Sequence, residues 1–120
     1  MTLEHTSGYA VDDFSVSLSA GEGVVRVGLA GDLDYSSTHL LDPVAAAVLL
    51  LGPLVVQIDV RRLRFCDIAG VRQIVDLHRS WHEHGLSVSM HGARPPVRQV
   101  FNLAGQSDLL QPHRRTADWK

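Results

Sequence analysis

Hydrophobic and polar residues alternate in the first part of the chain. Phe14, Val16 and Leu18 are separated by serines, the period-two pattern of a strand with one buried face. The segment Gly21-Glu22-Gly23 has the composition of a hairpin turn. Val24–Leu29 is apolar enough to form a central return strand. The pattern therefore predicts an antiparallel hairpin.

The next segment changes to helical spacing. A polar loop, Ala30–Asp34, precedes Ser36, Ser37 and Thr38, each of which can cap a helix. From Thr38 to Leu51 the apolar residues recur every three or four positions, which predicts a helix. Pro43 interrupts it, either as a kink or as the first residue of a second helix capped by Asp42. Gly52-Pro53 ends the helix.

Two more strand–helix units are expected further along. Leu54–Val60 is a short, nearly continuous apolar run, as in a buried parallel strand. A connector, Phe65–Gly70, leads into a helix that ends at Gly85, and Leu86–Met90 alternates as a further strand. The apolar face of that helix comprises Val71, Ile74, Val75, Leu77 and His78.

A third helix is predicted to start at Pro95-Pro96 and to end near Gly105. Its expected apolar positions are Val97, Val100, Phe101 and Leu103. Ser107–Leu110 is predicted as a last short strand.

These elements predict one α/β domain. Alternating strands and helices with short connections favour a mostly parallel central sheet of about four to five strands, with helices packed on it and an N-terminal antiparallel hairpin. We expect a flexible N-terminus at residues 1–8, the domain at 9–110 and a polar tail at 111–120.

Composition narrows the classes of function. The chain has 45% hydrophobic and 20% charged residues and a net charge of −2, so it lacks the basic excess of a nucleic-acid-binding protein. Cys66 is its one cysteine, which suits a reducing cytoplasm. Met1–Gly8 lacks the apolar run of a signal peptide, and the longest apolar stretch, Val44–Leu51, is too short to cross a bilayer. We expect a cytoplasmic protein without membrane insertion.

Three stretches in register resemble the STAS domain of bacterial anti-sigma-factor antagonists. Leu29-Ala30-Gly31-Asp32-Leu33-Asp34 is similar to the family's L-x-G-E-L-D loop. Val55–Val60 followed by Phe65–Val71 is similar to its hydrophobic strand and F-x-D-S-S/A-G-L turn. Gly85–Gly105 matches its closing strand and helix, and the resemblance covers roughly Tyr9 to Leu110.

One departure concerns the family's switch. In the family, a phosphorylated serine follows the aspartate of the turn, and here that position is Ile68, followed by Ala69. Neither side chain has a hydroxyl, so this turn cannot accept a phosphoryl group. Ile68 is then either an apolar contact exposed for a partner or one more core residue.

The resemblance implies a partner-binding surface and a partner. That partner is an anti-sigma factor of the serine-kinase-like type, and the oligomeric state stays open, a homodimer included. Asp67 and Asp34 should lie at adjacent strand ends, where capping and turn formation are compatible with binding. Whether Ser36, Ser37 or Thr38 is phosphorylated instead is open. The implied partner-binding residues are Asp32, Asp34, Tyr35, Ser36, Asp67, Ile68, Ala69 and Gly70.

Catalytic and metal chemistry find little support in the residues. His78, His82 and His84 share helical spacing, but no cysteine or clear acidic ligand completes a metal site, and ordinary histidines are the simpler interpretation. Cys66 precedes an acidic residue, which favours an inert thiol. No catalytic triad motif, P-loop or dinucleotide fingerprint occurs. We therefore expect no cofactor, no metal and no enzyme activity.

Two functions remain for a binding module. The first is an anti-sigma-factor antagonist that regulates transcription by partner switching but is not switched at Ile68. The second is a STAS-type structural or regulatory subunit of a multiprotein scaffold or of an ABC transporter complex. Loss of the hydroxyl is compatible with both.

Overall fold

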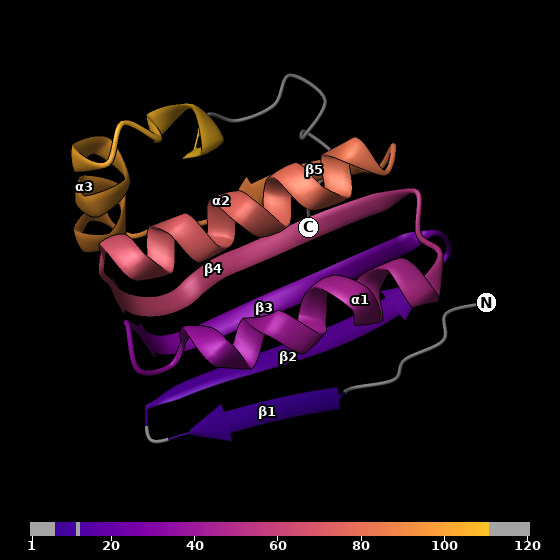
Figure 1. Ribbon diagram of the computed structural model, residues 1–120, viewed down its shortest axis with the longest axis horizontal. Helices are drawn as coiled ribbons and strands as arrows, with labels where there is room; N and C mark the ends of the chain where they lie inside the picture. Colours follow the sequence, from indigo (N-terminus) through magenta and orange to yellow (C-terminus); the bar gives the residue numbers. More distant parts are fainter. Residues whose placement is uncertain (1–6, 12, 111–120) are drawn as a thin grey trace.

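The computed structural model describes residues 7–11 and 13–110, with side chains from residue 13 onward. Its sheet has five strands, and their order in space is their order in the sequence (Figure 1). The first two pairings are antiparallel, and the pairings of β3 with β4 and of β4 with β5 are parallel. The strands are β1 (Ser7–Val11), β2 (Phe14–Gly21), β3 (Val24–Leu33), β4 (Val55–Cys66) and β5 (Ser87–His91).

The helices provide the parallel crossovers. After β3, the short 3-10 helix η1 (Thr38–Leu41) leads into α1 (Asp42–Leu51), and α2 (Ile68–Glu83) connects β4 to β5. Figure 1 shows α1 and α2 side by side on one face of the sheet. The chain continues with α3 (Pro95–Leu103), which packs on β4 and α2, and a 3-10 helix, η2 (Ser107–Leu110). No helix of the described residues is long and apolar enough to cross a membrane.

The predicted single α/β domain with its N-terminal hairpin is confirmed. The hairpin is formed by β2 and β3, and its turn places Glu22 and Gly23 at positive φ. One strand, β1, was not predicted, and with it the sheet is evenly mixed rather than mostly parallel. The predicted flexible segment 1–8 lies outside the described residues except for Ser7 and Gly8, which belong to β1. The predicted polar tail, 111–120, lies outside them entirely.

Strand β4 continues well past the predicted end at Val60. Arg61, Arg62 and Arg64 lie within it, and the predicted connector at Phe65 and Cys66 is its last part. The register against β3 shifts between Gly28 and Ala30, so that β4 contains an extra residue there. Such a bulge interrupts the inward alternation at Arg61 and Arg62, which explains why the apolar pattern indicated a strand that ends at Val60.

Other local predictions need correction. Pro43 lies in the first turn of a second helix, as one of the two predicted alternatives had it, but that helix starts at Asp42. Asp42 is therefore not the cap, because the cap position is Leu41, which makes no side-chain bond. Ser107–Leu110 is a 3-10 helix and not a strand. Leu51 and Leu103 lie at exposed positions although both were expected in apolar faces.

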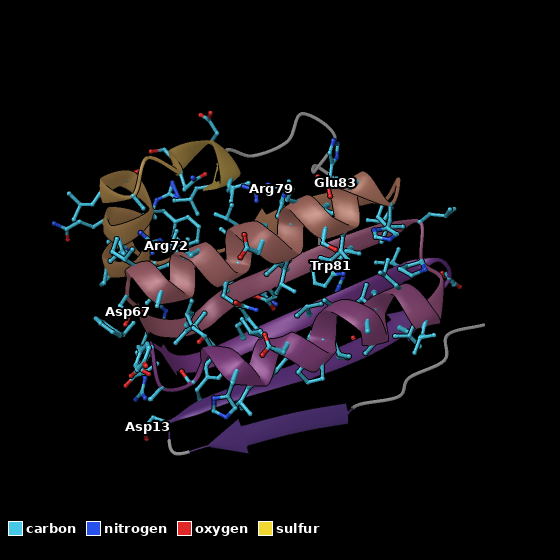
Figure 2. All side chains as sticks on the ribbon, in the orientation of Figure 1. Asp13, Asp67, Arg72, Arg79, Trp81 and Glu83 are labelled. Atoms are coloured by element: carbon cyan, nitrogen blue, oxygen red, sulfur yellow. The ribbon has the colours of Figure 1, made fainter. Side chains whose placement is uncertain are left out.

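The core fills the space between the sheet and the helices. It contains the inward residues of β2, β3 and β4 and a helix layer centred on Trp81, which is fully buried. The Trp81 indole N–H donates to the Ala45 carbonyl at 3.2 Å, so this side chain joins α2 to α1 (Figure 2). Residues on the other face of the sheet are polar and partly exposed, among them Ser17, Arg26 and Gln57. The carboxyl ends of β3 and β4 are packed into this core between the sheet and the helices through Leu33, Leu63 and Cys66.

Candidate functional site

The loops after β3 and β4 meet at one end of the sheet, and Asp67 joins them. Asp67 is the N-cap of α2, and its Oδ1 accepts a hydrogen bond from the Gly70 N–H at 2.9 Å. Its Oδ2 accepts one from the Tyr35 N–H at 3.0 Å. Its own N–H donates to the Leu33 carbonyl at 3.2 Å. Figure 2 shows Asp67 at the start of α2, so the predicted capping role is confirmed and includes a link to the neighbouring loop.

Asp34 organises the loop after β3. Its Oδ1 accepts hydrogen bonds from the Ser36 hydroxyl at 2.6 Å and from the Ser36 N–H at 2.9 Å. The side-chain bond from Ser36 is the largest cause that holds the pKa of Asp34 below its usual value. The carboxylate therefore stays ionised and shapes the turn, as predicted for it.

The hydroxyls of this loop differ in exposure. Ser37 is buried, and its Oγ accepts from the Asp34 N–H at 3.0 Å and donates to the Asp32 carbonyl at 3.1 Å. Ser36 is exposed, with its hydroxyl on Asp34, and Thr38 Oγ donates to the Tyr35 carbonyl at 3.4 Å. Ser37 is thus a structural residue of the loop, since modifying its oxygen would break both bonds.

Asp32 lies at the end of β3 and pairs with Arg64 of β4, at 3.4 Å between Oδ1 and the guanidinium. Both side chains are partly exposed, and such surface pairs contribute at most about 1 kcal/mol. Asp32, one of the predicted site residues, therefore lies on the surface of β3, next to Arg64 of β4.

Ile68, the first residue of α2, is an exposed apolar side chain. It is 41% exposed, so the interpretation as a core residue is wrong. Two further large apolar residues are exposed on the connected segments, Tyr35 at 83% and Phe65 at 46%. Because the carboxylate of Asp67 bonds to Tyr35 and Asp67 lies between Phe65 and Ile68 in the chain, these residues belong to one edge of the molecule. Ala69 is half-buried there.

Gly70 acts through close packing, because it is buried against β3 and β4. A Cβ at this position would lie 2.7 Å from both the Cys66 Sγ and the Leu33 carbonyl oxygen. Cys66 is buried, and burial, helped by the charge of Asp67, raises the pKa of its thiol to about 12. The thiol is therefore protonated at neutral pH, in agreement with the inert cysteine expected.

A groove between α2 and α3 continues from Ile68. It has a volume of about 460 Å³, and its outer lip is Leu103, which is 78% exposed. Charged residues of α2 line the same groove, and Figure 2 shows Arg72 and Arg79 on the side of α2 that faces α3. The lining residues are Ile68, Val71, Arg72, Val75, Asp76, Arg79, Leu103, Ala104 and Gln106.

Sequence reasoning missed Leu103 and Phe65 as surface residues. Val97, Phe101 and the half-buried Val100 follow the helical spacing that faces the core, whereas Leu103 falls outside that spacing. Its position off the buried face was a signal in the sequence that Leu103 is exposed. Phe65 carried no comparable signal, because the length of β4 depends on the bulge.

The histidines at 78, 82 and 84, in α2 and at its C-cap, do not come together around a common point. The rings of His78 and His82 stack with centroids 6.4 Å apart, and His84 Nδ1 lies 2.8 Å from the Ser80 carbonyl oxygen. Among the described residues, no group of three or more histidine, cysteine or acidic side chains could hold a metal ion.

The comparisons with known proteins agree with this architecture. The chain is similar to an anti-sigma factor antagonist from Mycobacterium paratuberculosis, at 18% identity over 91% of this chain and 92% of that chain, with a TM-score of 0.70. It is similar to the anti-sigma factor antagonist SpoIIAA in its unphosphorylated form, at 17% identity over 95% and 92%, with a TM-score of 0.65. A sulfate transporter family protein from Wolinella succinogenes matches at 20% identity over 74% and 72%, with a TM-score of 0.63.

At these identities the structural matches show a shared fold. No curated protein sequence matches the chain significantly. A family model described as "Mlab, STAS domain" matches residues 16–111, which include both loops of the site and all of α2 and α3. This chain therefore belongs to the STAS-domain family.

Proposed function

We propose that the chain is a protein-binding module of the anti-sigma-factor antagonist type. It binds a serine-kinase-like anti-sigma factor and regulates transcription by partner switching, in the cytoplasm. The observation that carries the proposal is the exposure of Ile68 at the position that holds a phosphorylated serine in antagonists of this family. An apolar residue exposed beside Tyr35 and Phe65 is the kind of surface that protein interfaces bury.

The side chain of Ile68 determines whether partner binding can be switched by phosphorylation at this position. A phosphoserine would add a charge of about −1.5 to −2 at this position, which would repel an acidic partner surface and disrupt an apolar contact through its desolvation cost. The isoleucine side chain accepts no phosphoryl group, so the contact is constitutive at this position. Release of the partner then depends on another part of the complex.

The groove between α2 and α3 extends the proposed surface. The lining combines apolar side chains, which suit an apolar residue of the partner, with the cation of Arg72, which suits an acidic residue beside it. Arg79 also lines the groove but is paired with Asp76. Asp67 contributes by fixing the loop and the start of α2 in one arrangement. The module needs no catalytic group, cofactor or nucleic acid for this role.

The test is a binding experiment with a matched control. Wild type, Ile68→Glu and Leu50→Glu are used to retain proteins from the native lysate, and each retained partner is then measured by isothermal titration. Leu50 is 87% exposed on α1, so its replacement adds the same charge outside the proposed surface. We expect a kinase-like anti-sigma factor to bind wild type and Leu50→Glu and to bind Ile68→Glu at least about tenfold more weakly. Equal binding of that partner by Ile68→Glu would contradict the proposed surface.

A second candidate is a STAS-type structural or regulatory subunit of a scaffold or of an ABC transporter complex. It is favoured by the Mlab description of the matching family model and by the likeness to a sulfate transporter family protein. The same experiment separates the two functions. Retention of a transport ATPase or of scaffold proteins, without an anti-sigma factor, would support this candidate and reject the first.

A further inference from the structure

The face of the sheet opposite α1 and α2 carries polar residues in rows that run across four strands. The registers of the pairings align these residues from β2 to β5. One row is Ser19, Arg26, Gln57 and Ser89, and the next is Ser17, Gly28, Asp59 and His91. The Arg26 Nε–H donates to Gln57 Oε1 at 3.0 Å, and Ser89 Oγ lies 2.8 Å from His91 Nε2. This face is thus a polar surface ordered by hydrogen bonds, and not an apolar surface that a helix would cover.

A hollow of about 260 Å³ lies in this face, over Gly28. Gly28 has no side chain between Ser17 and Asp59, and the Ser17 hydroxyl fills part of the space above it, because a Cβ there would lie 2.7 Å from Ser17 Oγ. The bulge of β4 brings two consecutive arginines to the wall of this hollow. Its lining is Ser15, Ser17, Gly28, Leu29, Ala30, Asp59, Arg61 and Arg62.

The charges of the lining leave one guanidinium for a ligand. Asp59 accepts from the Arg61 Nε–H at 3.0 Å and from its Nη2 at 2.8 Å, so the two charges offset each other. Burial acts to raise the pKa of Asp59, but the bonds and the charge of Arg61 outweigh it, and the pKa is lowered. Arg62 is exposed, and within residues 13–110 its guanidinium has no ion pair or hydrogen bond. Counting the described lining residues only, the hollow therefore carries a net positive charge, in a chain whose formal net charge is −2.

We propose that this hollow binds a small tetrahedral oxyanion, either inorganic phosphate or the phosphoryl group of a small metabolite. Arg62 supplies the charge and paired N–H donors, and the hydroxyls of Ser15 and Ser17 donate from the opposite wall. The absence of a side chain at Gly28 allows the Ser17 hydroxyl to lie in the hollow. The site lies on a different face from the proposed partner surface and does not depend on that proposal.

The test is a titration of ¹⁵N-labelled protein with inorganic phosphate, followed by amide chemical shifts at constant ionic strength with chloride as the balancing anion. We expect saturable shifts centred on Gly28, Ala30 and Arg62. The variant Arg62→Gln should weaken this binding about tenfold or more, because it removes a charge-assisted pair of bonds. Arg98→Gln is the control, since Arg98 is an exposed arginine of α3 outside the hollow.

A parallel titration with glycerol 3-phosphate distinguishes the two sources of the group. Tighter binding than that of phosphate identifies a phosphorylated metabolite, and equal binding identifies the free anion. Shifts that grow without saturation, that spread over arginines outside the hollow or that persist in Arg62→Gln would overturn the proposal. Because Arg62 is exposed, we expect Arg62→Gln to fold as wild type does. The amide spectrum of the variant verifies this before phosphate is added.

Discussion

The carboxylate of Asp67 accepts a hydrogen bond from the backbone N–H of Tyr35 at 3.0 Å, a residue 32 positions earlier in the chain. The other oxygen of the same carboxylate caps α2 through the Gly70 N–H. The exposed side chains of Tyr35 and Ile68 are therefore positioned by one group. A cap that also fixes a neighbouring loop couples the stability of the helix to the shape of the surface beside it.

Replacing Asp67 by alanine should lower the free energy of unfolding by about 1–3 kcal/mol, because both amides lose a charged acceptor. Urea denaturation measures the change. Asp67→Asn retains one carbonyl oxygen and so can satisfy only one of the two amides, and its loss should be smaller.

The control for this change is Asp76→Ala. Asp76 lies on α2 in an exposed pair with Arg79 at 3.5 Å, and its removal should change stability by less than about 0.5 kcal/mol. A loss for Asp67→Ala no larger than that of the control would show that the two bonds do not stabilise the fold.

The substitution Gly70→Ala should destabilise the protein although alanine is the better helix former. In an open helical position this change stabilises by about 1 kcal/mol. Here the new Cβ would meet Cys66 Sγ and the Leu33 carbonyl oxygen at 2.7 Å, so we expect a loss of about 1–3 kcal/mol in urea denaturation.

The double variant Gly70→Ala with Cys66→Ala tests the cause. Removing the sulfur relieves one of the two close approaches, so the glycine substitution should cost less in that background. An equal or greater stability of Gly70→Ala relative to wild type would refute the packing argument.

The thiol of Cys66 should react very slowly with Ellman's reagent in the folded protein at about pH 8. Burial and the charge of Asp67 raise its pKa to about 12, so almost no thiolate forms, and the sulfur is inaccessible. In urea above the unfolding transition the reaction should reach one thiol per chain at the rate of an ordinary cysteine. Fast labelling before unfolding would mean that the end of β4 opens readily.

The free energy of unfolding should fall as the pH is lowered from about 7.5 to about 5.5. Burial, followed by the nearby His82, lowers the pKa of His78 below its usual 6.5, and burial also lowers that of His91. In the window between the lowered pKa and 6.5 the unfolded chain binds more protons, so stability is present above 6.5 and is lost on acidification. The carboxylates of Asp34 and Asp59, whose pKa values lie below 3.8, titrate outside this window.

Urea denaturation of His78→Gln at both pH values checks this assignment. The variant should show a smaller pH dependence than wild type, because it lacks the imidazole whose pKa is lowered by burial. A pH dependence unchanged in His78→Gln would assign the effect to other groups.

The strands and helices with clear periodicity could be predicted from the sequence, and those set by tertiary contacts could not. The alternation from Phe14 to Leu18 and the turn at Gly21–Gly23 correspond to β2 and its hairpin. The segment Ser7–Val11 forms β1 by pairing with β2, and five residues contain too little pattern to show it. Ser107–Leu110 has strand-like composition but packs as a single turn against α3 and β5.

For the site, the sequence indicated that Asp34 and Asp67 lie at neighbouring strand ends. It left two interpretations of Ile68 open, because exposure depends on which way the first turn of α2 faces. The groove between α2 and α3 was beyond prediction, since it depends on the angle at which the two helices pack.

The strand order has a consequence for how the chain is made. Each strand pairs with the strand that precedes it in the sequence. None of these five strands therefore has to insert between two strands that were synthesised earlier. Growth from the N-terminus can add strands one at a time onto an existing edge, with α1 and α2 covering the new surface as it forms. A ribosome-bound chain that ends after α2 would therefore already contain a continuous sheet from β1 to β4, together with the whole Asp67 cap.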